Sequence, residues 1–195
     1  CSSPHFDIII NNGKIADGSG SKLFSANIYI KNGKIIEIGN LPNALGDKVL
    51  DAQDLIIAPG FIDMHTHAER RSLEFPTVEN YLQQGVTTIV GGNCGGSPFP
   101  INDFMEKTVQ KGIGPNLALL IGHNTVRKEV MGTENRLATN KEIDEMQRII
   151  QESMNQGAFG MSTGLKYIPG AYSNTDEVIA LASTVSNNNG IYATH

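Results

Sequence analysis

The chain has 195 residues, of which 39% are hydrophobic and 18% are charged, a composition typical of a folded globular protein and not of a disordered one. The net charge is −5 and the basic residues do not cluster, which argues against nucleic acid as the main partner. No apolar run approaches the length of a membrane span.

The chain begins with Cys1, followed by Ser-Ser-Pro, and not with methionine. A mature bacterial lipoprotein begins in this way after its signal peptide is removed and its first cysteine is lipidated. We therefore expect a lipid anchor at Cys1 and a place in the bacterial cell envelope, as a periplasmic or outer-membrane-anchored lipoprotein. The alternative is a cysteine that trimming left first by chance, in a cytoplasmic protein. The second cysteine, Cys94, is so placed that a disulfide framework is not expected.

Residues 1–58 are predicted to form a small amino-terminal β domain. A β-rich run at 6–10 leads into the turn sequence Asn-Asn-Gly, and residues 27–39 nearly repeat this pattern around a second Asn-Gly turn. The run at 48–60 continues the strands, so the sequence favours an antiparallel β unit over 5–58.

Strands and helices alternate from residue 59 to residue 195. The predicted strands are 61–67, 86–92, 116–122, 158–164 and 191–195, and the predicted helices are 77–85, 101–112, 140–157 and 174–190. Continuous apolar strands in such an alternation predict a parallel sheet covered on both faces. Either the sheet is doubly wound, or it is the first five strands of a (β/α)₈ barrel, which needs eight.

Some helix ends carry recognisable signals. Gly112 is the expected stop of the helix at 101–112. Thr139 or Asn140 is the expected cap of the third helix, and Asn174 or Thr175 that of the fourth.

Nitrogen and sulfur donors gather at the carboxyl ends of the predicted strands, where α/β folds place their ligands. His65 and His67 stand two apart on the first strand and would face the same side of the sheet. Cys94 follows the second strand, and His195 ends the fifth. Imidazole and thiolate are the donors that zinc prefers, so these four residues are predicted metal ligands. His123, after the third strand, would line the pocket near the metal or satisfy a loop.

Other interpretations of these residues stay open. A lone pair of histidines is equally compatible with one surface and one structural histidine. Cys94 could be a nucleophile, although the neighbouring histidines favour a metal. Ser97 and Ser162 stand in no nucleophile elbow, so we expect both to be structural. Asp63 would point with the histidines and either orient an imidazole or belong to a buried structural network.

The stretch "APGFIDMHTH", residues 58–67, resembles the first-strand signature of the metal-dependent amidohydrolase superfamily. The stretches "GVTTIVGGNCG", "GHNTVR", "GAFGMSTGLKYIPGAYSNTDEVIALA" and "GIYATH" are similar to the N-acyl-D-amino-acid deacylases, or D-aminoacylases, in order and spacing over nearly the whole chain. The expected fold class is therefore α/β: a partial (β/α)₈ TIM-type barrel of about five βα units, preceded by the amino-terminal part of a small β-sandwich domain.

The resemblance also implies roles for single residues. It makes His65 and His67 the paired ligands of the first strand, Cys94 a bridging thiolate, His195 the ligand of the fifth strand and Tyr167 a residue that holds the substrate. One or two zinc ions are the implied cofactor. The family's strand-6 histidine, its strand-8 aspartate, which is the general base, and a basic residue that binds the substrate carboxylate have no counterpart before residue 195.

The resemblance implies a zinc-dependent enzyme that hydrolyses the linear amide bond of N-acyl-D-amino acids with metal-activated water. Its partner would be this small-molecule substrate, and the acyl group and side chain stay open. We expect residues 1–195 alone to be inactive and to need a carboxyl-terminal half or a partner chain that completes the barrel. The alternatives are another amidohydrolase, dihydropyrimidinase- or dipeptidase-like, which Cys94 disfavours, and a truncated chain that binds metal without catalysis.

Overall fold

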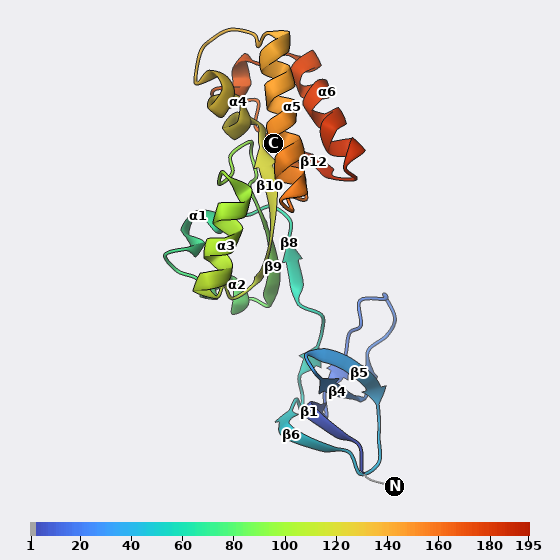
Figure 1. Ribbon diagram of the computed structural model, residues 1–195. Helices are drawn as coiled ribbons and strands as arrows, with labels where there is room; N and C mark the ends of the chain where they lie inside the picture. Colours follow the sequence, from blue (N-terminus) through green and yellow to red (C-terminus); the bar gives the residue numbers. More distant parts are fainter. Residues whose placement is uncertain (1–2) are drawn as a thin grey trace. The chain divides into compact units, whose positions relative to one another are not determined.

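The computed structural model describes residues 3–195, so Cys1 and the lipid anchor expected there lie outside the described residues. The chain forms two compact units, one that ends at Pro59 and one at Gly60–His195 (Figure 1). Within residues 3–195 no helix is both long and apolar enough to cross a membrane.

The first unit contains two small sheets. The larger has the order β5-β4-β1-β6, with β1 at His5–Asn11, β4 at Asn27–Lys31, β5 at Lys34–Gly39 and β6 at Leu45–Asp51. The smaller has the order β3-β2-β7, with β2 at Lys14–Ile15, β3 at Phe24–Ser25 and β7 at Ile56–Ile57. Phe6, Ile9 and Tyr29 form the buried core of the unit.

The expectation that this unit is antiparallel throughout is wrong. β1 pairs antiparallel with β4, but it pairs in parallel with β6, and β2 pairs in parallel with β7. The Asn-Gly turn does form, since Asn32 and Gly33 both have positive φ, and it joins the hairpin β4–β5. A turn sequence predicts the strands on either side of it, whereas a strand that returns after a long connection leaves no local signal.

The second unit contains a five-stranded parallel sheet in the order β12-β11-β10-β9-β8. The strands are β8 at Phe61–Asp63, β9 at Val86–Gly91, β10 at Asn116–Gly122, β11 at Gly160–Thr163 and β12 at Ile191–Thr194. Their order in space is their order in the chain, as in a barrel, whereas a doubly wound sheet reverses direction midway. The sheet is a five-stranded parallel half-barrel.

Four helices of nine residues or more accompany this sheet in the described part of the chain: α3 at Ile101–Lys111, α4 at His123–Met131, α5 at Asn140–Asn155 and α6 at Thr175–Asn187. Shorter helical turns are α1 at Glu69–Ser72, α2 at Glu79–Leu82 and η1 at Gly170–Tyr172. Thr139 caps α5 in a capping box with Glu142, Asn174 caps α6, and Gly112 ends α3 in the left-handed conformation. The predicted helix at 77–85 is shorter in the structure, where α2 has four residues.

Helix α4 is absent from the sequence-based prediction, which placed His123 at a strand end. Gly122 ends β10 and is also the N-cap of α4, so His123 is the first residue of the helix. A strand that passes into a helix at one glycine leaves no loop, and therefore no run of polar turn residues from which the boundary could be read.

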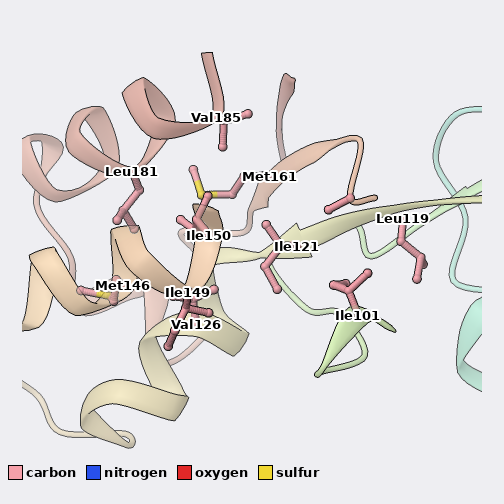
Figure 2. Close-up of a cluster of buried hydrophobic side chains, with 11 residues drawn as sticks. Ile101, Leu119, Ile121, Val126, Met146, Ile149, Ile150, Met161, Leu181 and Val185 are labelled. Atoms are coloured by element: carbon pink, nitrogen blue, oxygen red, sulfur yellow. The ribbon is translucent and has the colours of Figure 1, made fainter. Parts of the chain in front are cut away.

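A buried hydrophobic cluster packs strands β10 and β11 against helices α3 to α6 (Figure 2). The buried members are Ile101, Leu119, Ile121, Val126, Met146, Ile149, Ile150, Ala158, Met161, Leu181 and Val185. The helical spacing of Met146, Ile149 and Ile150 puts all three side chains of α5 on this face.

A buried polar network joins α4 to α6 next to this cluster. His123 donates a hydrogen bond from Nε2 to Oε1 of Glu177 at 2.8 Å, and Arg127 forms an ion pair with the same carboxylate. Arg127 also donates to the backbone oxygen of Arg136 at 2.6 Å. All three side chains are at most 1% exposed. Of the two roles considered for His123, the contacts favour the structural one, because its Nε2 is bound to Glu177.

We expect Glu177→Gln to lower the free energy of unfolding by about 3–5 kcal/mol, because it leaves the charge of Arg127 buried without a counter-ion. Burial raises the pKa of Glu177, but hydrogen bonds from His123 and Arg127 outweigh it and hold this pKa below 4.5. The contribution of the ionised Glu177 carboxylate to the free energy of unfolding is therefore present above the usual glutamate pKa of 4.5. It is lost as the pH falls through the lowered pKa of Glu177. Urea denaturation at neutral and acidic pH measures it, and equal stability of the two proteins at neutral pH would contradict it.

Candidate metal centre

Three donor side chains meet at the carboxyl end of the half-barrel. His65 follows β8, Cys94 follows β9 and His195 follows β12. Nε2 of His65 lies 3.3 Å from Sγ of Cys94, and Sγ of Cys94 lies 3.2 Å from Nδ1 of His195. One donor atom from each residue lies within 4.8 Å of the other two. Two imidazoles and a thiol at these distances fit a zinc ion, which binds nitrogen and sulfur donors at about 2.0–2.3 Å.

Cys94 reaches this position through a loop that is held by its backbone. Its own φ is 58°, a left-handed conformation that is uncommon for a residue with a Cβ. The buried Ser162 of β11 accepts a hydrogen bond from the amide of Gly95 at 2.9 Å and donates one to the carbonyl of Gly92. Ser162 is therefore structural, as expected, and what it holds in place is the cysteine loop.

His67 lies beside the three donors but is not one of them. β8 ends at Asp63, so His65 and His67 lie beyond the strand and the prediction of a strand over 61–67 is wrong at this end. Strand alternation therefore does not determine where their side chains point. The ring of His67 stands edge-on to that of His65 with the centroids 5.9 Å apart. Burial, then the positive charge of Arg70, lowers the pKa of His67, which favours the neutral imidazole that can bind a metal.

Asp63 contacts backbone at this strand end. Its Oδ1 accepts a hydrogen bond from the backbone amide of His65 at 3.0 Å. This bond supports the turn that carries His65 away from the strand, so of the two roles considered for Asp63 the geometry favours the structural one.

Tyr167 lies on the β11 side of the group. Its ring centroid is 5.7 Å from that of His195, and 44% of the residue is exposed. A hollow of about 430 Å³ is lined by His67, Arg70, Cys94, Gly96, Asn124, Tyr167 and Ile168. Tyr167 thus lines a space that a small molecule could enter beside Cys94, and its role toward a substrate stays a prediction.

Sequence reasoning missed Glu69, the first residue of α1. Its side chain is 1% exposed, and neither carboxylate oxygen has a hydrogen-bond partner within the described chain. Oε1 lies 3.9 Å from Nδ1 of His67 and 4.0 Å from Nε of Arg70. A glutamate in a polar stretch after a strand is normally exposed. The feature of the sequence that could have pointed to Glu69 as a site residue is its position, two residues after His67.

The chain resembles known proteins over almost its whole length. The model of the Amidohydrolase family matches residues 48–184. The chain is 34% identical to a D-aminoacylase of Alcaligenes xylosoxydans xylosoxydans, with 99% of this chain and 45% of the relative covered. It is 33% identical to an N-acyl-D-aspartate deacylase of the same organism, with 97% and 43% covered. The chain therefore spans a little under half the length of these relatives.

Two solved structures extend the likeness to the backbone. The N-acyl-D-glutamate deacylase of Bordetella bronchiseptica, solved with zinc and a phosphonate inhibitor, gives a TM-score of 0.93 at 30% identity and covers 98% of this chain and 45% of its own. A D-aminoacylase structure gives a TM-score of 0.90 at 31% identity and covers 97% and 45%. A five-stranded parallel half-barrel and the small sheets of the first unit are thus each part of the fold of these deacylases.

We expect Cys94→Ala to lose most of the bound zinc and Cys94→Asp to retain part of it. Alanine removes a donor, whereas aspartate keeps a negative donor of similar reach with a harder oxygen atom. Metal content after dialysis, measured by mass spectrometry, tests this. His5→Ala is the matched control, because His5 belongs to the first unit, pairs with Asp47 and should leave the zinc content unchanged. Full zinc content in Cys94→Ala would make Cys94 a packing residue.

Proposed function

Because the chain belongs to the Amidohydrolase family, we propose that it is part of a zinc-dependent enzyme that hydrolyses N-acyl-D-amino acids to a carboxylate and a free D-amino acid. The observation that carries this proposal is the group of His65, Cys94 and His195, three donors from three strand ends within 4.8 Å. Likeness over 97% or more of the chain to a D-aminoacylase, an N-acyl-D-aspartate deacylase and an N-acyl-D-glutamate deacylase supports the substrate class.

His65, Cys94 and His195 would hold a zinc ion. Zinc is present in the related N-acyl-D-glutamate deacylase structure, and a binuclear metal centre is named for D-aminoacylase. When bound, zinc supplies a Lewis acid that polarises an amide carbonyl and lowers the pKa of water to about 7.

Residues that line the hollow beside Cys94 can bind the substrate. Tyr167 stands beside His195 and is half exposed, so its hydroxyl can donate a hydrogen bond to an oxygen atom of the substrate. Arg70 adds a positive charge to the same hollow, which favours a substrate that carries a carboxylate. The leaving amine needs a proton donor, and we assign it to a carboxylate outside residues 1–195, since the relatives are about twice as long.

We expect the full-length protein to release free amine from N-acetyl-D-amino acids faster than from their L enantiomers. A chelator should abolish turnover and zinc should restore it, while His195→Ala should lose turnover together with bound zinc. Steady-state assays on a panel of both enantiomers measure this, with His5→Ala as the control. Turnover of cyclic amides in place of linear ones would favour the dihydropyrimidinase-like alternative, and bound zinc without turnover of any amide would favour metal binding without catalysis.

We expect residues 1–195, purified free of any other chain, to turn over little substrate. Strands β8 and β12 each pair on one side only, and they carry the exposed apolar residues Phe61, Ile62, Ile191 and Tyr192. Such edges recruit further chain, and the proposed proton donor is absent from this segment. Light scattering with the amine-release assay tests both points, and robust turnover by monomeric 1–195 would contradict the assignment of the proton donor.

A further inference from the structure

Two buried glutamates of the second unit differ in whether their carboxylates have hydrogen-bond partners. Glu177 and Glu69 are each 1% exposed. The carboxylate of Glu177 is bound by His123 and Arg127, whereas that of Glu69 has no hydrogen-bond partner among the described residues. A buried carboxylate without a partner is costly to the folded state, so a fold that contains one calls for a compensating interaction.

The space around Glu69 is shaped for its carboxylate. A Cβ added to Gly91, the last residue of β9, would lie 2.8 Å from Oε2 of Glu69. Gly91 does not have a positive φ, so the glycine is explained by this close approach and not by its backbone conformation. The carboxylate therefore occupies a site built at the strand end that precedes Cys94.

Two groups near Glu69 can supply hydrogen-bond donors. Nε of Arg70 is 4.0 Å from Oε1, but its side chain is 61% exposed and extends toward solvent. Nδ1 of His67 is 3.9 Å from Oε1, and this nitrogen is itself buried and without a partner in the described chain. Two buried polar atoms that both lack partners thus face each other, and a small rotation of the imidazole would bring them to hydrogen-bond distance.

We propose that Glu69 is a positioning residue for His67: its carboxylate accepts a hydrogen bond from Nδ1–H, which fixes the tautomer and leaves the lone pair of Nε2 free for a metal. A metal-binding histidine commonly donates its second ring N–H to a carboxylate, and this contact orients the ring. His67 then joins the group of His65, Cys94 and His195 when zinc binds. This inference rests on the proposed zinc site and adds Glu69 to it.

The tautomer of His67 in the metal-free protein is the first test. The chain contributes five histidines, so a ¹⁵N-histidine correlation spectrum is tractable, and His67→Asn identifies the signal of His67. We expect Nδ1 of His67 to carry the proton in the parent protein and the proportion of this tautomer to fall in Glu69→Leu, which has no acceptor; the amide oxygen of Glu69→Gln can still accept. An unchanged tautomer in Glu69→Leu would overturn the proposal, and this readout does not depend on zinc or on turnover.

Zinc affinity, measured by competition with a chromophoric chelator, is the second test. Glu69→Gln should weaken zinc binding by about 10–100-fold, the usual effect of losing such a contact. Glu69→Asp keeps the carboxylate on a side chain that is one methylene shorter, so its zinc affinity should lie between that of the parent and that of Glu69→Gln. Glu129→Gln, the same change at an exposed position of α4, is the matched control and should bind zinc as the parent does.

Thermal stability of the metal-free variants separates positioning from a packing role. Glu69→Gln keeps the size of the side chain and breaks no ion pair of the kind that Glu177 makes with Arg127, so it should melt near the parent's temperature, whereas Glu177→Gln should melt below it. A Glu69→Gln protein that melts lower while its zinc affinity is unchanged would make Glu69 structural. If the parent binds no zinc yet shows the Nδ1–H tautomer, the proposed function fails and the Glu69–His67 contact stands.

Discussion

Close packing of backbone against backbone is the constraint on which the candidate site depends. Gly92 packs against the carbonyl of Leu120, Gly122 against that of Gly95, and Gly164 against that of Cys94. Any Cβ at these three glycines would overlap a main-chain atom, so the segments at the ends of β9, β10 and β11 can pack this closely only without side chains there. This packing carries Cys94 away from its own strand and toward His65 and His195.

The parts of the fold that could be read from the sequence are those with local signals. The strand over 116–122 and the caps at Thr139 and Asn174 agree with the structure, because apolar periodicity and side-chain capping act within a few residues. The parallel pairing of β1 with β6 has no such signal, and neither does the passage from β10 into α4. The residue types next to the strand ends could be read for the same reason, because they are local features, and their metal chemistry stays a prediction.

What the sequence could not show is which donors meet. His65 and His67 are equivalent in the pattern, yet in the structure His65 lies with Cys94 and His195 while His67 faces Glu69. This difference arises where β8 stops, two residues before His65, and a strand end is set by pairing with its neighbour β9. The burial of Glu69 likewise depends on the absence of a side chain at Gly91, the last residue of β9.

The three-donor group joins the two outermost strands of the five-stranded sheet. In a flat sheet β8 and β12 would lie four strand spacings apart, roughly 19 Å, yet donor atoms that follow these two strands lie within 4.8 Å of each other. The side chains reach inward from an arc, so the group sits near the axis about which the sheet curves. An ion held there would act as a tie between the first and the fifth strand, across 130 residues of chain from His65 to His195. The affinity for the metal ion would then depend on the curvature of the sheet. A substitution that makes the sheet flatter would weaken metal binding although it changes no ligand.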